Sequence, residues 1–250
     1  MATSRLSARL RRELLAPIEG IVFDKDGTLI DLDARWVGFF RSIISTVAAA
    51  GDDPGAEQSL AAVLGVGTDR IEPEAPAATK TQGELLEIAI GHLVGRGWSA
   101  DDALSAIGTA IETAEFGPLR PIGDVADAIQ RLSAGYRLGL ATSDNRDSTI
   151  DELARLGIDR HLSRVHCGDD GGPVKPDPEV LLGFGRYWGL EPLQMLFVGD
   201  SEQDLVTARQ AGSAFVAVVT AMPSESAVDP PSPLAAEADA WIISIEELAR

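Results

Sequence analysis

The amino-acid sequence predicts an α/β protein in which an all-helical block interrupts a parallel sheet after its first strand. Residues 18–23 form a short, nearly continuous apolar run, as buried parallel strands do. Residues 32–118 then place apolar side chains mainly at helical spacing. From Pro121 onward apolar runs alternate with helical patterns, and repeated β-α units are typical of a parallel sheet with helices on both faces.

Helical patterns lie on both sides of the first strand. An amphipathic segment rich in arginine precedes it and is predicted to be a helix that leads into the sheet. In the block that follows, Ser99 and Asp102 resemble a capping pair at the start of the last helix. The apolar positions at helical spacing in this block are Trp36, Phe39, Phe40, Ile43, Ile44, Val47, Leu85, Ile88, Ala89, Leu93, Leu104, Ile107 and Ile111.

Strands and helices alternate through the second half of the chain. Glycines such as Gly157, Gly189 and Gly212 follow helical patterns and are predicted to end them. Asp177 and Pro178 suit the N-cap and the first residue of a helix. We expect strands at 136–141, 165–167, 195–198, 215–219 and 241–243, helices at 121–134, 148–156, 178–188 and 202–211, and a mobile loop at 221–233.

Composition restricts the classes of partner. Lysine and arginine total 21 against 39 aspartates and glutamates, so the formal net charge is -18. This charge opposes binding to nucleic acid or to an anionic membrane, and we expect small molecules or metal ions as partners. No apolar stretch has membrane-spanning length, so the expectation is a soluble monomer or homodimer. Cys167 is the single cysteine, which excludes an intrachain disulfide and favours a reducing, cytoplasmic location.

Two carboxylates directly follow the first predicted strand. Asp24 and Asp26 are two residues apart, so on an extended segment their side chains point the same way. Two anions held so close repel each other unless a cation or a shared proton compensates. Gly27 and Thr28 suit a tight turn whose N–H groups and hydroxyl could meet an anionic ligand. A solvated Asp-Lys-Asp-Gly turn is the alternative interpretation.

Three further polar clusters lie at or just after predicted strand ends, where open α/β sheets bind ligands. Thr142 and Ser143 lead from a strand into a helix, which suits either phosphate binding or ordinary helix capping. Lys175 is one of three lysines beside eighteen arginines; its compact charge could reach a phosphate oxygen and a carboxylate, or lie solvated in a loop. Asp200 ends another strand, and Asp204 follows one helical turn later, where it also suits a helix N-terminus.

These clusters together indicate a metal site. Four carboxylates converging at one end of a sheet would repel each other strongly without a cation. Hard oxygen ligands without nearby histidine or cysteine indicate Mg²⁺, which usually shares its coordination shell with a substrate phosphate. Hydroxyl groups and one lysine would complete a site for a phosphoryl group. The expected metal ligands are Asp24, Asp26, Asp200 and Asp204.

With these motifs in this order, the chain resembles the haloacid dehalogenase superfamily of hydrolases, in its phosphoglycolate phosphatase-like subgroup. The resemblance covers about residues 18–220 and implies a Rossmann-like core at 1–31 and 119–250, with a helical cap at 32–118 between the first two motifs. The residues that carry it are Asp24-Lys25-Asp26-Gly27-Thr28, Thr142, Lys175, and Gly199-Asp200 with Asp204.

The resemblance also implies an activity, namely Mg²⁺-dependent hydrolysis of a small-molecule phosphate monoester through an aspartyl-phosphate. Asp24 would be the nucleophile, and Asp26 the general acid and base, whose backbone carbonyl also binds the metal. Asp200 would bind the metal directly, while Asp204 would orient its ligand waters. Lys175 would neutralise charge on the phosphoryl group and the nucleophile. The residues expected to contact substrate are Thr28, Thr142, Ser143, Lys175, Arg70 and Lys80, the last two in an irregular cap segment at 65–83.

Other activities share this fold. Haloacid dehalogenases lack the second aspartate of the first motif, so the presence of Asp26 together with Asp200 argues against dehalogenation. A phosphomutase of the β-phosphoglucomutase kind would have the same core motifs. A non-catalytic ligand-binding protein could keep the fold as well, because fold alone does not determine function.

Overall fold

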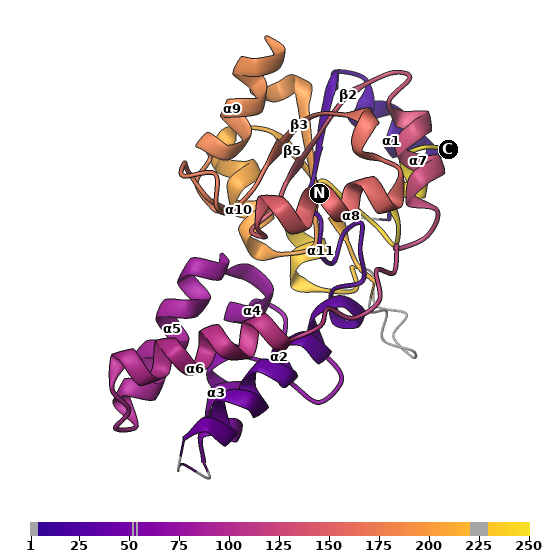
Figure 1. Ribbon diagram of the computed structural model, residues 1–250. Coiled ribbons are helices and arrows are strands. Elements are labelled where there is room, and N and C mark those ends of the chain that lie inside the picture. Colours follow the sequence, from indigo (N-terminus) through magenta and orange to yellow (C-terminus); the bar gives the residue numbers. More distant parts are fainter. Residues whose placement is uncertain (1–4, 52, 54, 221–229) are drawn as a thin grey trace. The chain divides into compact units, whose positions relative to one another are not determined.

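The computed structural model describes residues 5–51, 53, 55–220 and 230–250, and the chain divides into two compact units (Figure 1). The core unit comprises Met1–Ile30 and Pro121–Arg250. The helical unit comprises Asp31–Arg120. Most of the segment for which the sequence predicts a mobile loop, 221–229, lies outside the described residues.

A six-stranded sheet forms the centre of the core unit, in the order β3-β2-β1-β4-β5-β6, and every neighbouring pair is parallel. The strand order reverses between β1 and β4, and ligands bind doubly wound sheets at this switch point, beyond the carboxyl ends of the strands. The predicted Rossmann-like parallel sheet is therefore confirmed. Its strands are β1 (Gly20–Phe23), β2 (Arg137–Ala141), β3 (Leu162–His166), β4 (Met195–Gly199), β5 (Ala214–Val218) and β6 (Ala240–Ile242).

Helices cover both faces of this sheet. On one face, Phe184 and Ala208 share an apolar cluster with Val22, Phe197 and Phe215 of the central strands. Side chains alternate along a strand, so the equally buried neighbours of these strand residues face the other helical layer. The helices are α1 (Ala8–Leu15), α7 (Val125–Leu132), α8 (Arg146–Leu156), α9 (Glu179–Trp188), α10 (Glu202–Ala211) and α11 (Pro233–Glu237), with short 3-10 helices η1 (Asp159–His161), η2 (Pro192–Gln194) and η3 (Ile245–Glu247).

Most predicted elements of the core unit agree with the observed ones within a few residues. The helix expected at 202–211 is α10, and Gly212 ends it in the left-handed conformation with φ 77°. Pro178, expected as the first helical residue of α9, is its N-cap instead. The Asp177 side chain accepts a hydrogen bond from the Glu179 N–H at 2.9 Å, so it still serves the start of this helix.

The helical unit has a core of its own, which includes the buried side chains of Val47, Leu60 and Leu93. Ser99 caps its last helix by accepting a hydrogen bond from the Asp102 N–H at 3.0 Å, which confirms the predicted cap. Its helices are α2 (Leu32–Ala50), α3 (Ala56–Leu64), α4 (Pro76–Thr79), α5 (Gln82–Gly95) and α6 (Ala100–Thr113).

The segment 65–83 is more regular than the sequence predicts. It contains the short helix α4 and an antiparallel bridge between Val66 and Ile71. Neither is long enough to show a periodic apolar pattern, which explains why the segment reads as irregular. Within the described ranges, none of the helices combines the length and apolarity needed to cross a bilayer.

The inserted segment leaves and re-enters the core unit at adjacent points. Within the core unit, the Ile122 N–H donates to the Leu29 carbonyl at 2.9 Å. Within the helical unit, the Asp31 N–H donates to the Arg120 carbonyl, also at 2.9 Å. In each unit, the two segments of chain that lead to the other unit are therefore hydrogen-bonded to each other.

Candidate active site

Polar side chains predicted at different strand ends meet beyond β1 and β4. Asp24 follows β1, and its N–H donates to the Val198 carbonyl of β4 at 2.9 Å. Asp200 follows β4, and Asp204 lies in the first turn of α10. Side-chain oxygens of Asp24, Asp200 and Asp204 lie within 4.8 Å of one another. The switch point of the sheet therefore holds three carboxylates around a volume suited to one cation.

Two glycines let these carboxylates approach the backbone closely. Gly27 has a φ of +82°, and a Cβ there would lie 2.0 Å from Asp200 Oδ2. A Cβ at Gly199 would lie 2.5 Å from the Asp204 side chain. Gly27 thus needs both the left-handed backbone and the missing side chain, so any other residue there would displace the Asp200 carboxylate.

Lys175 joins two of the three carboxylates. Its Nζ lies 2.8 Å from Asp24 Oδ1 and 2.7 Å from Asp204 Oδ1, and all three side chains are buried. Burial alone would lower the pKa of Lys175, but the charges of Asp204 and Asp24 outweigh burial and raise this pKa above its ordinary value. Lys175 is therefore a fixed positive charge within the cluster.

The start of α10 holds Asp204 in place. Asp204 and Ser201 form a capping box, in which the Ser201 hydroxyl accepts a hydrogen bond from the Asp204 N–H. Asp204 Oδ2 accepts hydrogen bonds from the N–H groups of Ser201 at 3.1 Å and Asp200 at 3.2 Å. Its other oxygen faces Lys175. The sequence left two roles open for Asp204, a residue of the helix N-terminus or a member of the carboxylate cluster. In the structure Asp204 has both positions.

Two of the three carboxylates, those of Asp24 and Asp200, lie where ionisation is unfavourable. Burial raises the pKa of Asp24 to about 7, with Lys175 opposing the rise and Asp204 adding to it. Burial also raises the pKa of Asp200 well above its ordinary value, and Asp24 and Asp204 add to the rise. A divalent cation would relieve this repulsion, and Mg²⁺ prefers carboxylate oxygens. The donor set therefore fits magnesium.

Lys25, to which the sequence interpretation assigns no role, is completely buried. Its Nζ pairs with Asp26 at 3.0 Å, with Asp144 at 2.8 Å, and with Glu152 of α8. Burial would lower the pKa of Lys25, but these three carboxylates raise it above its ordinary value. The alternative of a solvated Asp-Lys-Asp-Gly turn is therefore wrong. The scarcity of lysine that singles out Lys175 applies equally to Lys25 and could have identified it.

The hydroxyl residues predicted to bind substrate have different surroundings. Thr28 is fully buried and donates a hydrogen bond to Asp200 Oδ1 at 3.0 Å, so its hydroxyl supports a carboxylate. Thr142 is buried at the carboxyl end of β2, where its oxygen accepts a hydrogen bond from the Asp144 N–H at 3.1 Å. Ser143 is half-buried in the same loop. Thr142 and Ser143 thus lie at the strand end next to β1, in the position expected of them.

Arg70 and Lys80 belong to the helical unit, and each has an acidic partner there. Arg70 pairs with Glu72 at 3.0 Å on the surface. Lys80 Nζ lies 3.3 Å from Glu84 Oε1, across the first turn of α5. Their predicted contact with substrate therefore remains a prediction, because these pairs account for their charges within the helical unit.

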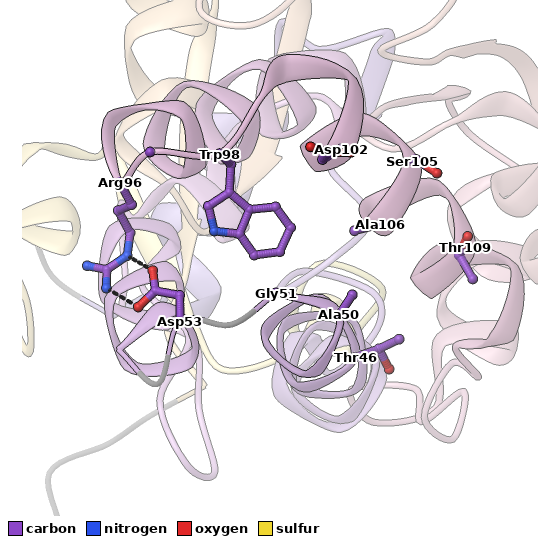
Figure 2. Close-up of a pocket in the computed structure, with 11 residues that line it drawn as sticks. Thr46, Ala50, Gly51, Asp53, Arg96, Trp98, Asp102, Ser105, Ala106 and Thr109 are labelled. Carbon is purple, nitrogen blue, oxygen red and sulfur yellow. Dashed lines mark hydrogen bonds and ion pairs between the residues drawn. The ribbon is translucent and has the colours of Figure 1, made fainter.

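The helical unit also contains a hollow of about 560 Å³, lined by residues of α2 and α6, by Gly51 and Asp53 after α2, and by the connection after α5 (Figure 2). Arg96 and Asp53 face each other there through two hydrogen bonds of 2.6 Å. A Cβ at Gly51 would lie 1.9 Å from the Trp98 ring, so the ring rests directly on the backbone. Neither Arg70 nor Lys80 lines this hollow.

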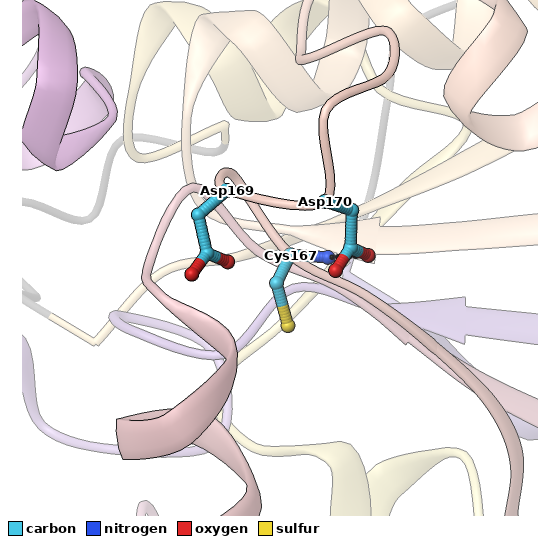
Figure 3. A group of neighbouring side chains, drawn as sticks. All are labelled: Cys167, Asp169 and Asp170. Atoms are coloured by element: carbon cyan, nitrogen blue, oxygen red, sulfur yellow. Dashed lines mark hydrogen bonds between the residues drawn. The ribbon is translucent and has the colours of Figure 1, made fainter.

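A second group of possible metal ligands, Cys167, Asp169 and Asp170, follows β3 (Figure 3). Arg146 already supplies a cation, since its guanidinium donates two hydrogen bonds of 2.6 Å to the Asp170 carboxylate. Burial raises the pKa of the Cys167 thiol to about 11, whereas a metal binds the thiolate. An internal ion pair therefore explains this group, and we assign it no metal.

Comparisons with known proteins agree with the motifs and the fold. Residues 18–212 match a family described as haloacid dehalogenase-like hydrolase. A phosphoglycolate phosphatase from Agrobacterium fabrum is 31% identical over 191 residues, which are 76% of each chain. A solved structure of a predicted phosphoglycolate phosphatase from Haemophilus somnus has a TM-score of 0.65 at 21% identity, over 93% of this chain and 96% of that chain. A 2-haloacid dehalogenase from Pseudomonas syringae has a TM-score of 0.57 at 22% identity, over 92% and 96%.

Proposed function

The chain belongs to the haloacid dehalogenase-like hydrolases, and we propose that it is a Mg²⁺-dependent phosphatase acting on a small-molecule phosphate monoester. The observation that carries the proposal is the cluster of Asp24, Asp200 and Asp204 with the Lys175 ammonium between two of them. Asp26 adds the second carboxylate of the first motif, which dehalogenases lack. The site therefore favours phosphoryl transfer, although the fold accommodates both reactions.

Asp24 is the proposed nucleophile and Asp26 the proposed proton carrier. An oxygen of Asp24 attacks phosphorus, and the bond between phosphorus and the ester oxygen breaks, which leaves an aspartyl-phosphate. Asp26 gives its proton to the departing alkoxide. As a carboxylate, Asp26 then takes a proton from the water that attacks the aspartyl-phosphate. The bond between phosphorus and Asp24 breaks, inorganic phosphate leaves, and both aspartates return to their starting forms.

Lys175, Thr142 and Ser143 are proposed to bind the phosphoryl group. Lys175 favours ionised Asp24 and is proposed to neutralise a phosphoryl oxygen. The Thr142 oxygen already accepts a hydrogen bond from the backbone, so its hydroxyl hydrogen is proposed to bind a phosphoryl oxygen. Ser143 lies beside it and is a further candidate.

Magnesium is proposed to bind Asp24, Asp200 and the backbone carbonyl of Asp26, with Asp204 orienting its ligand waters. When bound, the ion supplies a positive charge that stabilises the phosphoryl oxygens in the transition state. It also explains how the buried carboxylates of Asp24 and Asp204 and the half-buried carboxylate of Asp200 can share a small volume in the ionised form that the nucleophile requires.

Phosphoglycolate is the first substrate to test, because the Agrobacterium relative carries that name. Selectivity is proposed to come from the helical unit, with Arg70 and Lys80 as candidate contacts. We further propose action in the cytoplasm as a monomer or homodimer without nucleic-acid or membrane partners, in keeping with a net charge of -18 and a single cysteine.

A phosphate-release screen tests the proposal. The purified protein would be assayed with Mg²⁺ against phosphoglycolate, sugar phosphates, nucleotides and pyrophosphate, with Asp24→Asn as a control of equal size. We expect release from at least one monoester and none from the variant. An active Asp24→Asn variant would refute the assignment of the nucleophile.

The same screen separates the two alternatives. Isomerisation of a sugar phosphate that requires a sugar bisphosphate, with slow net release of phosphate, would establish a phosphomutase. Binding of a phosphorylated compound without turnover of any would establish a non-catalytic ligand-binding protein.

A further inference from the structure

We propose that Lys25, Asp144 and Glu152 form a buried unit that positions Asp26 for its two proton transfers. The inference rests on the proposed phosphatase mechanism, which assigns Asp26 those transfers. The Lys25 ammonium lies 3.0 Å from Asp26 Oδ2 and has no exposed surface. A completely buried ammonium therefore contacts the carboxylate of Asp26 directly.

Three separate elements hold the ammonium. Asp26 belongs to the turn after β1, Asp144 to the loop after β2, and Glu152 to α8. Asp144 Oδ2 lies 2.8 Å from Lys25 Nζ, and the same oxygen accepts a hydrogen bond from the Ser148 hydroxyl at 2.8 Å. Because the partners come from different elements, the position of the ammonium is set by the fold and not by the flexible lysine chain.

The carboxylates of Asp26, Asp144 and Glu152 are buried to different extents. This difference indicates which of them can contact a substrate and which can only hold Lys25. The side chains of Asp144 and Glu152 are 3% and 1% exposed, whereas that of Asp26 is 14% exposed. Asp144 and Glu152 are therefore inaccessible to a substrate, while Asp26 keeps a surface open to one. The two inaccessible carboxylates hold Lys25, and Lys25 holds the accessible one.

Stability alone does not account for this arrangement. Replacing a buried ion pair with apolar residues of similar volume is often neutral or stabilising, so a buried ammonium with three carboxylates is a poor way to fill a core. Placement of a proton donor is a stronger reason. A general acid must lie within hydrogen-bond reach of the leaving oxygen, and a displacement of about 1 Å costs about 10²-fold in rate.

Kinetics of Lys25→Met and Glu152→Gln test this role, with Asp151→Asn as the matched control. Asp151 is the exposed neighbour of Glu152 on α8, and its variant makes the same change from carboxylate to amide. With phosphoglycolate, or another alkyl monoester that the screen identifies, we expect kcat to fall about 10²-fold in the first two variants with KM changed little, and the control to behave as wild type. Circular dichroism would establish folding first, and Glu152→Gln decides the outcome should Lys25→Met not fold.

An aryl phosphate gives the readout that a general loss of structure would not produce. Nitrophenolate leaves without a proton, so formation of the aspartyl-phosphate from p-nitrophenyl phosphate does not need Asp26. Hydrolysis of the aspartyl-phosphate does need Asp26, because a proton must be taken from the attacking water. We therefore expect the Glu152→Gln and Lys25→Met variants to release a rapid burst of about one nitrophenolate per site, followed by slow turnover.

Each other result has a defined meaning. An equal loss of the burst and of turnover, or kinetics unchanged from wild type, would overturn the positioning role while leaving the proposed phosphatase intact. A wild-type protein that releases phosphate from no monoester would instead refute the proposed function, and the inference with it.

Discussion

Replacing Lys175 with methionine measures how much its ammonium, paired with two buried carboxylates, contributes to the stability of the protein. Methionine keeps the length of the side chain and removes the charge, so Asp24 and Asp204 lose contacts of 2.8 and 2.7 Å in a buried setting. Breaking a buried ion pair by removing one partner costs about 3–5 kcal/mol. For a chain of 250 residues, each kcal/mol corresponds to about 2–4 °C, so we expect the melting temperature to fall by roughly 6–20 °C.

Thermal unfolding at pH 7 in a chelator, followed by circular dichroism, checks this value. Lys80→Met is the matched control for stability, because Lys80 and Glu84 form a pair across one helical turn with side chains 38% and 40% exposed. Such exposed pairs contribute about 0.3–0.5 kcal/mol. Should Lys175→Met melt within two degrees or so of Lys80→Met, the reasoning from burial would be refuted.

Two further predictions concern the carboxylates themselves. Gly27→Ala places a Cβ 2.0 Å from Asp200 Oδ2 and strains a left-handed residue by about 1–2 kcal/mol, so we expect lower stability and a large loss of Mg²⁺ affinity by calorimetry; affinity equal to wild type would contradict this. Because burial raises the pKa of Asp24 from 3.8 to about 7, the folded metal-free protein binds more protons than the unfolded chain between these pH values. Its unfolding free energy in urea should therefore contain a contribution that falls as pH rises through this range, which Asp24→Asn removes, and the stabilisation by Mg²⁺ should be larger at pH 8 than at pH 5. An equal shift with Mg²⁺ at both pH values would contradict the metal site.

Strands buried on both faces are the part of the fold that local sequence predicts well. The residues of β1 and β4 are entirely buried, so each reads as a continuous apolar run. β3 is an edge strand, and its sequence contains Arg164 and His166, so it does not form a continuous apolar run. Only its last residues are therefore predicted. α11 has five residues, too few to show helical periodicity.

Three of the four carboxylates expected to converge, those of Asp24, Asp200 and Asp204, do so because parallel strands deliver their carboxyl ends to one edge of the sheet, whereas the Asp26 side chain pairs with Lys25. The surroundings of Lys25 were not predictable, because its partners Asp144 and Glu152 lie 119 and 127 residues further along the chain. The hydrogen bond from the Thr28 hydroxyl to Asp200 was not predictable for the same reason, because the two residues are 172 positions apart. Residue type and spacing identify groups that share a strand end, whereas the partner of a buried side chain depends on tertiary packing.

The two segments of chain that connect the units are hydrogen-bonded to each other, which has a consequence for how much the inserted helical unit can vary. The Leu29 and Ile122 backbones are already hydrogen-bonded within the core unit, so this contact does not depend on the residues of the helical unit. Closing a flexible loop costs only about 0.6 kcal/mol more for each doubling of its length. Insertions of very different size can therefore be accommodated at this point. Under the proposed function, replacing this one continuous segment would change substrate preference, while the carboxylates at the sheet edge keep their positions.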